Sequence, residues 1–273
     1  MSLLRLVRRF ASHSQCNFLT SAVHSLPDPS KANKTGEDAS YLSASCLAVA
    51  DGLTWPDCAF DPAKYSRELM ANVGHALVSL PAEKRLHPQA IMLRAAAQTS
   101  AEGGSTCCIL TLDPQQAKVY SANLGDSGYY LLRMSSKGKV EIVGKSRDVV
   151  IHYNEPRLLG MQGDSADRCD VEVHEVQDKD LILMFTDGFC YNVFPEQVAS
   201  FLKPFLALEQ EPDLEVIAEM LAEKAFKQSQ DLLFDSPFAV KAAENMLGLR
   251  WDGGKPNDIT LIAAQVHLLR PNS

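Results

Sequence analysis

The chain has 273 residues, of which 46% are hydrophobic and 22% charged, so it has enough apolar residues for a full core and is neither fibrous nor intrinsically disordered. The net charge is -8, and residues 35–273 hold 21 basic and 33 acidic side chains. An acidic body argues against nucleic-acid binding, which needs a basic face, and suits divalent cations. No apolar run is long enough for a membrane-spanning helix, which takes about 20 residues.

The first 26 residues form a separate compositional zone with three arginines, five serines and no acidic residue. On a helix, the apolar and basic residues would lie on opposite faces, with Leu3, Leu6, Val7 and Phe10 against Arg5, Arg8 and Arg9. This combination is typical of a mitochondrial presequence, and a basic tail or a peripheral helix is the alternative. We therefore expect a presequence and linker over residues 1–34, a catalytic domain over residues 35–270 and a location in the mitochondrial matrix.

The elements expected in the first part of the domain begin with a short apolar strand, Cys46–Ala50, which stops at an Asp-Gly turn. A helix follows Asp61, because Asp61 supplies an N-cap carboxylate and Pro62 suits the first helical position. A second helix is expected over residues 88–100.

The middle of the chain consists of short β-rich runs separated by turn sequences. The runs cover residues 106–112, 118–123, 129–134 and 140–143, with turns at 113–114, 125–128 and 135–138. Three hairpin-like connections in succession predict an antiparallel meander. Further strands are expected at residues 171–176, 181–185 and 259–268, and helices at 195–208, 214–228 and 237–247. Because strands and helices come in blocks, an α+β fold is favoured over a doubly wound parallel sheet.

Acidic residues stand where several of these strands begin or end. They are Asp51, Asp187 and Asp258, together with the pair Glu37-Asp38. A turn explains one such residue, but carboxylates that crowd one sheet edge repel each other unless cations hold them together. Because the donors are all oxygen atoms, Mg²⁺ or Mn²⁺ is favoured over zinc.

Six short motifs occur in order along residues 37–260. They are Glu37-Asp38, Asp51-Gly52, Gly104-Ser105-Thr106, Ala122-Asn123-Leu124-Gly125-Asp126-Ser127, Thr186-Asp187-Gly188 and Asn257-Asp258-Ile259-Thr260. In this order and spacing the chain resembles the type 2C metal-dependent serine/threonine protein phosphatases. Three further segments resemble the small mitochondrial branch that is linked to coenzyme Q biosynthesis, namely His152-Tyr153-Asn154, Asp235-Ser236-Pro237-Phe238 and Gly253-Gly254-Lys255-Pro256.

The resemblance implies a four-layer fold in which two antiparallel sheets pack face to face, helices cover both, and a metal cleft lies at one edge. It implies that Asp51, Asp187 and Asp258, with the backbone carbonyl of Gly52, hold two Mn²⁺ or Mg²⁺ ions. The cations would lower the pKa of a bridging water, and the resulting hydroxide would attack the phosphorus of a phosphoserine or phosphothreonine ester.

The resemblance also implies a catalytic role for three more carboxylates. Glu37 would hold a metal-bound water, whereas Asp38 and Asp126 would support the ligands or hold a third metal. The substrates would be phosphoproteins, and neither a nucleic-acid partner nor an integral membrane segment is expected.

The sequence departs from the family pattern at three positions. Asn33 stands where a phosphate-binding arginine is expected, with Lys34 next to it. Leu53 replaces a histidine proposed as a proton donor, and Tyr191 replaces an aspartate that helps to bind a third metal. Lys34, and His152 in a predicted flap, are the candidate substrate-binding residues.

These departures leave two alternatives to an active phosphoprotein phosphatase. In the first alternative, the chain is a pseudophosphatase that keeps the fold and acts as a binding module. In the second, it is a hydrolase of small phosphoesters that uses the same metal core. Retention of Asp51, Asp187 and Asp258 favours the enzyme.

Overall fold

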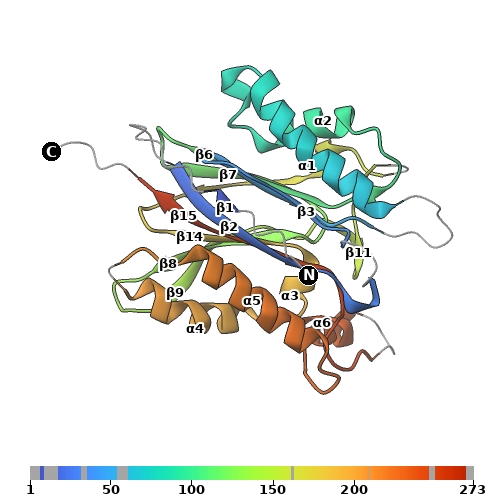
Figure 1. The fold of residues 1–273 in the computed structure, drawn as a ribbon, viewed down its shortest axis with the longest axis vertical. Coiled ribbons are helices and arrows are strands. Elements are labelled where there is room, and N and C mark those ends of the chain that lie inside the picture. The colour runs from blue at the N-terminus through green and yellow to red at the C-terminus, as the bar shows by residue number, and fades with distance from the viewer. Residues whose placement is uncertain are drawn as a thin grey trace.

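The computed structural model describes residues 7–8, 18–31, 36–53, 61–160, 163–208, 210–245 and 250–268. Two antiparallel β-sheets pack face to face, and helices cover the outer face of each sheet (Figure 1). This arrangement confirms the α+β architecture expected from the sequence. Within the described ranges, no helix has both the length and the apolar character needed to cross a membrane.

One sheet has five strands in the order β13-β7-β6-β4-β3. Their bounds are Asp170–Glu175 (β13), Lys118–Leu124 (β7), Cys107–Asp113 (β6), Cys46–Ala50 (β4) and Ala39–Leu42 (β3). Its outer face is covered by α1 (Pro62–Ser79) and α2 (Pro88–Gln98) (Figure 1). As predicted, α1 begins after Asp61, whose carboxylate accepts a hydrogen bond from the N–H of Ala63.

The other sheet has six strands in the order β1-β2-β15-β14-β8-β9. Their bounds are Val7–Arg8 (β1), Phe18–Leu26 (β2), Ile259–His267 (β15), Leu181–Phe185 (β14), Gly128–Met134 (β8) and Val140–Lys145 (β9). Its outer face packs against α4 (Pro195–Leu206) and α5 (Leu214–Ser229) (Figure 1). The short helix α3 (Asp187–Cys190) follows β14, and α6 (Pro237–Asn245) precedes β15 in the chain.

Four very short strands form two separate pairs. They are β5 (Gly104–Ser105) with β12 (Leu159–Gly160), and β10 (Val150–His152) with β11 (Glu155–Pro156). Three short 3₁₀ helices cover Pro29–Lys31, Ala82–Lys84 and Ala166–Arg168. We call residues 148–160, which contain the β10–β11 pair, the flap.

The core is divided into layers by the two sheets. Between them, Leu47 and Leu110 of the five-stranded sheet pack in one buried cluster with Leu131, Met184 and Ile262 of the six-stranded sheet. Burial of side chains of this size stabilises the fold by about 1.5–3 kcal/mol each. A second cluster lies under α1 and α2, and a third under α4 and α5. The four-layer arrangement follows from these three apolar interfaces.

The connection at residues 125–128 is not a hairpin, so the predicted meander is wrong at this point. The turns at 113–114 and 135–138 do join paired strands, β6 with β7 and β8 with β9. Residues 125–128 instead carry the chain from β7 in one sheet to β8 in the other. The sequence predicts the turn at residues 125–128 correctly, but not the pairing of the strands on either side of it. Local sequence does not specify which sheet the next strand joins. The crossover places Asp126 between the two sheets.

The folded domain begins before residue 35. Strand β2 pairs with β15 along all of its nine residues, from Phe18 to Leu26. The polar side chains of β2 make this segment resemble a presequence and a linker. In the structure they have partners on β15, because Thr20 is hydrogen bonded to His267 at 2.8 Å and Ser25 to Thr260 at 2.9 Å. The domain boundary expected at residue 35 is therefore wrong, because polar cross-strand partners let this segment serve as a strand.

Of the segment expected to form an amphipathic presequence helix, only Val7–Arg8 before β2 is described. These residues form β1, which pairs with Ala22 and Ser21 of β2. Lys34 lies outside the described residues, as do residues 1–6, 9–17, 32, 33 and 35.

Candidate metal centre

The strands that carry the predicted metal ligands end at the same edge of the molecule. In the six-stranded sheet, Phe185 pairs with Leu261, so Asp187 leaves β14 beside the point where Asp258 enters β15. In the five-stranded sheet, Ala39 pairs with Ala50, so Glu37 and Asp38 precede β3 beside Asp51. Antiparallel pairing therefore brings together acidic residues that lie far apart in sequence.

A cavity of about 240 Å³ opens at this edge. Most of the residues predicted to form the site line it, namely Glu37, Asp51, Gly52, Asp126 and Asp187. Asp258 and Asp38 are not among its lining residues, although both lie in the same carboxylate cluster. The structure therefore brings the predicted carboxylates together, with five of the predicted residues at the cavity and Asp38 and Asp258 beside them.

Asp258 anchors the segment before β3. Its Oδ1 accepts a hydrogen bond from the N–H of Asp28 at 2.7 Å, and its Oδ2 accepts one from the N–H of Glu37 at 2.8 Å. The backbone of Asp258 also lies very close to the backbone of Gly188, because a Cβ on Gly188 would lie 2.1 Å from the carbonyl oxygen of Asp258. Only a glycine lets the start of α3 approach β15 so closely. Asp258 therefore links β15, α3 and the residues around Glu37.

Asp38 has a buried carboxylate oxygen that accepts no hydrogen bond from the described residues. Its Oδ2 accepts a hydrogen bond from Thr186 Oγ1 at 2.8 Å, whereas its Oδ1 is buried and has no partner in this part of the chain. Burial, followed by the nearby charge of Asp258, raises the pKa of Asp38 to about 7. An unpaired buried carboxylate oxygen is costly, and a nearby cation would offset that cost.

Asp51 and Asp187 meet at the cavity. Burial and the neighbouring charges of Asp38 and Asp187 hold the pKa of Asp51 well above its usual range, and the Asp51 carboxyl group is hydrogen bonded to Asp187. Asn257 Nδ2 donates a hydrogen bond of 2.6 Å to Asp187 Oδ1, which orients that carboxylate. On the backbone side, the N–H of Asp51 donates to Thr106 Oγ1 at 3.0 Å. Asn257 thus orients the carboxylate of Asp187, and Thr106 holds the backbone of Asp51.

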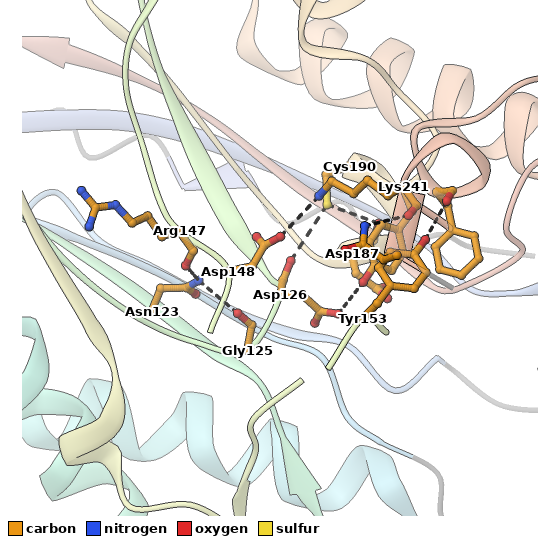
Figure 2. A network of polar contacts seen from close by, with 12 residues as sticks. Asn123, Gly125, Asp126, Arg147, Asp148, Tyr153, Asp187, Cys190 and Lys241 are labelled. Atoms are coloured by element: carbon orange, nitrogen blue, oxygen red, sulfur yellow. Dashed lines mark hydrogen bonds and ion pairs between the residues drawn. The ribbon is translucent and has the colours of Figure 1, made fainter. Parts of the chain in front are cut away.

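Asp126 completes the cluster from the crossover between the sheets. The phenolic hydroxyl of Tyr191 donates a hydrogen bond of 2.7 Å to Asp126 Oδ2. Burial, followed by the charge of Asp187, raises the pKa of Asp126 to about 7. The Cys190 thiol contacts the backbone oxygens of Asp126 and Asp187, at 3.9 and 3.6 Å, and Figure 2 shows these three residues together.

These residues fit a hard divalent cation. The donors are carboxylate and carbonyl oxygens, and burial together with the charges of neighbouring carboxylates raises the pKa values of Asp38, Asp51 and Asp126. One buried oxygen of Asp38 has no hydrogen-bond partner in the described part of the chain. Among the described residues, no three acidic, histidine or cysteine side chains already converge as a finished metal cage. Bound cations would offset the negative charge of these carboxylates.

Comparison with known proteins agrees with this geometry. A family model described as Stage II sporulation protein E (SpoIIE) matches residues 67–267. Probable protein phosphatase 2C 26 of Arabidopsis thaliana is 31% identical over 264 residues, which cover 91% of this chain and 84% of that protein. Protein phosphatase PTC7 homolog of Danio rerio is 32% identical over 250 residues, 85% of this chain and 81% of that protein. This chain belongs to the protein phosphatase 2C family.

Solved structures share the fold. The X-ray structure of the photosystem II phosphatase PBCP matches with a TM-score of 0.80 and 31% identity, covering 92% of this chain and 100% of that one. The catalytic domain of the serine threonine protein phosphatase PstP, in complex with 2 manganese ions, matches with a TM-score of 0.62 and 20% identity, covering 92% and 99%. The resemblance to the type 2C protein phosphatases drawn from the sequence is confirmed. As a protein phosphatase 2C, the chain is a metal-dependent phosphatase that uses Mn²⁺ or Mg²⁺.

Of the two residues predicted to bind substrate, Lys34 lies outside the described residues and His152 is not brought to the cavity. His152 lies exposed on β10 and does not line the cavity, whereas Asn154 and Pro156 of the same flap do. Leu53, at the position of the family's proposed proton donor, lines the cavity and is 37% exposed. In this protein phosphatase 2C, the flap thus approaches the metal centre through Asn154.

Lys255 is the residue that the sequence prediction missed. It lines the cavity, and its ammonium nitrogen lies 4.7 Å from the ring centroid of Tyr191 and 4.4 Å from that of Phe238. The sequence does contain a feature that could have indicated Lys255, because this lysine stands three residues before Asp258 in the loop that leads to this carboxylate. A lysine so close to a predicted ligand is a candidate for contact with an anionic substrate.

Proposed function

We propose that this protein phosphatase 2C hydrolyses phosphoserine and phosphothreonine esters of protein substrates at a binuclear Mn²⁺ or Mg²⁺ site. The proposal depends on one observation, the convergence of carboxylates from both sheets on a single cavity, with a buried oxygen on Asp38 that has no partner among the described residues. Burial of several carboxylates together costs stability, and bound cations would offset that cost.

Asp51, Asp187 and Asp258, with the backbone carbonyl of Gly52, would hold the cations. Once bound, the cations supply an activated water as nucleophile and neutralise charge on the phosphoryl group. Glu37 would hold a water at the cavity wall, where its backbone is fixed by the hydrogen bond to Asp258.

The neighbouring polar residues would keep the carboxylates in place during the reaction. Asn257 orients Asp187 and Thr186 orients Asp38 through the hydrogen bonds described above. The hydroxyl of Tyr191 holds Asp126 at the side of the cavity nearest α3. Positioning side chains of this kind preserve a reactive geometry to within fractions of an ångström.

Hydrolysis of p-nitrophenyl phosphate with and without Mn²⁺ tests the proposal, together with a panel of phosphoserine and phosphothreonine peptides. We expect hydrolysis of both substrates that depends on Mn²⁺ and is lost in Asp51→Asn. Binding of Mn²⁺ without turnover of any substrate would indicate a pseudophosphatase. Hydrolysis of small esters alone would indicate a small-molecule phosphoesterase.

We further propose that the protein acts in the mitochondrial matrix and that the presequence ends before Phe18. The arginine-rich, acid-free composition of residues 1–17 supports the targeting role, and the pairing of β2 with β15 supports the limit. Residues 1–17 fused to a fluorescent reporter should direct it to mitochondria. The same fusion with Arg5, Arg8 and Arg9 changed to Glu should stay in the cytosol, and a cytosolic reporter with the native segment would contradict the proposal.

A further inference from the structure

Lys255 is held in place by its backbone. Its N–H donates to Asn192 Oδ1 at 2.9 Å, and its carbonyl oxygen accepts from Asn192 Nδ2 at 2.9 Å. Asn192 is completely buried and also donates to the carbonyl oxygen of Gly188, at the start of α3. This arrangement fixes the position of Lys255 relative to the helix that carries Asp187.

The side chain of Lys255 keeps its positive charge available. Its ammonium group lies over the rings of Tyr191 and Phe238 and donates a hydrogen bond to Asn154 Oδ1 of the flap. Aromatic faces and an amide oxygen support an ammonium group without neutralising it. No carboxylate in the described part of the chain forms an ion pair with Lys255.

A cation at this position is suited to a phosphoryl group. The cavity wall is acidic, with Glu37, Asp51, Asp126 and Asp187, and a phosphate monoester carries close to two negative charges at neutral pH. A positive charge on the cavity wall, in addition to bound cations, helps to offset repulsion of the substrate. Asp126 already accepts a hydrogen bond from Tyr191. Lys255 donates one N–H group to Asn154, and its remaining N–H groups can bind an oxygen of the incoming phosphoryl group.

We propose that Lys255 binds a phosphoryl oxygen of the substrate. It thereby supplies the positive charge that an arginine would supply at the position where this chain has Asn33. The inference rests on the proposed function and assigns one residue to substrate binding within it. A lysine contacts phosphate as a point charge from one side, without the two-pronged contact of an arginine. The hydrogen bond to Asn154 then places the flap against the bound phosphoryl group.

The test measures binding of inorganic phosphate to the Mn²⁺-loaded protein by calorimetry, so that it requires no turnover. Lys255→Met keeps the aliphatic stem over the two rings but removes the charge, and Lys255→Arg keeps the charge. Lys241→Met is the matched control, because Lys241 pairs with Asp148 of the flap at 3.4 Å and does not line the cavity. The number and affinity of bound Mn²⁺ ions and the melting temperature are measured for every variant.

We expect Lys255→Met to weaken phosphate binding by about 10–100-fold, the effect of losing one hydrogen bond to a charged group, with Mn²⁺ binding unchanged. Its KM for p-nitrophenyl phosphate should rise by a similar factor, whereas Lys255→Arg and Lys241→Met should stay within about threefold of wild type. An unchanged phosphate affinity in Lys255→Met, an equal loss in Lys241→Met, or a loss of Mn²⁺ affinity in parallel would each overturn the assignment. If the wild type binds phosphate through Lys255 but hydrolyses no ester, the proposed function fails and the binding role of Lys255 stands.

Discussion

Tyr191 Oη donates a hydrogen bond of 2.7 Å to Asp126 Oδ2, at the position where related phosphatases carry an aspartate. This contact occupies one of the two carboxylate oxygens with a neutral donor. A further cation beside Asp126 would have to displace the hydroxyl. Tyr191 therefore disfavours a third metal and supplies a hydrogen bond to Asp126.

Tyr191→Asp should create a site for one more Mn²⁺ ion than the wild type binds. The substitution removes the donor and adds a negatively charged oxygen ligand near Asp126. The number of bound ions is measured by equilibrium dialysis and by electron paramagnetic resonance of Mn²⁺. Tyr191→Phe is the control, because it removes the hydroxyl without adding a ligand, and it should bind the same number as wild type. Equal numbers in wild type and Tyr191→Asp would show that Tyr191 does not decide metal occupancy.

The stability of the metal-free protein should fall as the pH rises from about 4 to about 7. The pKa values of Asp38 and Asp126 are raised to about 7, and that of Asp51 is also raised, above the value of about 3.9 that applies in an unfolded chain. In this window the folded state binds more protons than the unfolded state, so the free energy of unfolding decreases with pH.

Thermal melts in the presence of a chelator check this expectation. The melting temperature should be lower at pH 7.5 than at pH 5, and added Mn²⁺ should raise it more at pH 7.5, where the carboxylates are free to ionise. A melting temperature that rises across this range without metal would mean that the carboxylates are not crowded in the folded protein.

Asp51→Asn and Asp187→Asn should each remove most of the Mn²⁺-dependent activity and leave the fold intact. The amide keeps the shape of the side chain but lowers the charge that binds the cations. Without metal, Asp51→Asn should melt at a higher temperature than wild type, because it relieves repulsion with Asp38 and Asp187.

A buried aspartate outside the site provides the control for these substitutions. Asp113 is 3% exposed at the end of β6, where its Oδ1 accepts from the N–H groups of Gln115 and Gln116. Asp113→Asn keeps an acceptor oxygen and should retain activity. Wild-type turnover in Asp51→Asn at low Mn²⁺ would contradict the metal assignment.

The sequence predicts those parts of the fold and the site that depend on local signals. The strand Leu181–Phe185 and the helix start at Asp61 agree with prediction, because an apolar run and an N-cap aspartate followed by proline are readable without the rest of the chain. Contacts across the fold are not readable in this way. Strand β2 depends on β15, more than 200 residues away, and Lys255 is linked to Asn154 across 101 positions.

Removal of residues 1–17 should leave a stable, active protein, whereas removal of residues 1–26 should not. The shorter deletion keeps β2, and the longer one exposes the edge of β15 and removes Leu19 from the core between the sheets. Circular dichroism melts and Mn²⁺-dependent hydrolysis compare the two truncations. A cooperative melt at wild-type temperature in the protein that starts at Pro27 would show that β2 is dispensable.

Leu53 should make the rate of hydrolysis strongly dependent on the leaving group. It lines the cavity at the position of the family's proposed proton donor and cannot give a proton to the departing oxygen. A well-placed general acid contributes about 10²–10⁴-fold, most for poor leaving groups such as the serine alkoxide. Aryl phosphates should therefore be hydrolysed much faster than alkyl phosphates at equal Mn²⁺. Leu53→His should reduce the difference, because it places an imidazole at the cavity.

A series of substituted phenyl phosphates, measured beside a phosphoserine peptide with both proteins, gives the dependence of rate on leaving-group pKa. A shallow dependence in the wild type would mean that another group donates the proton. Asp126 would then be the first candidate, because it lines the cavity and its pKa is raised to about 7, near the value that suits a general acid at neutral pH. His152 would follow only if the flap moved, since it lies outside the cavity. Equal slopes in wild type and Leu53→His would show that residue 53 does not reach the leaving group.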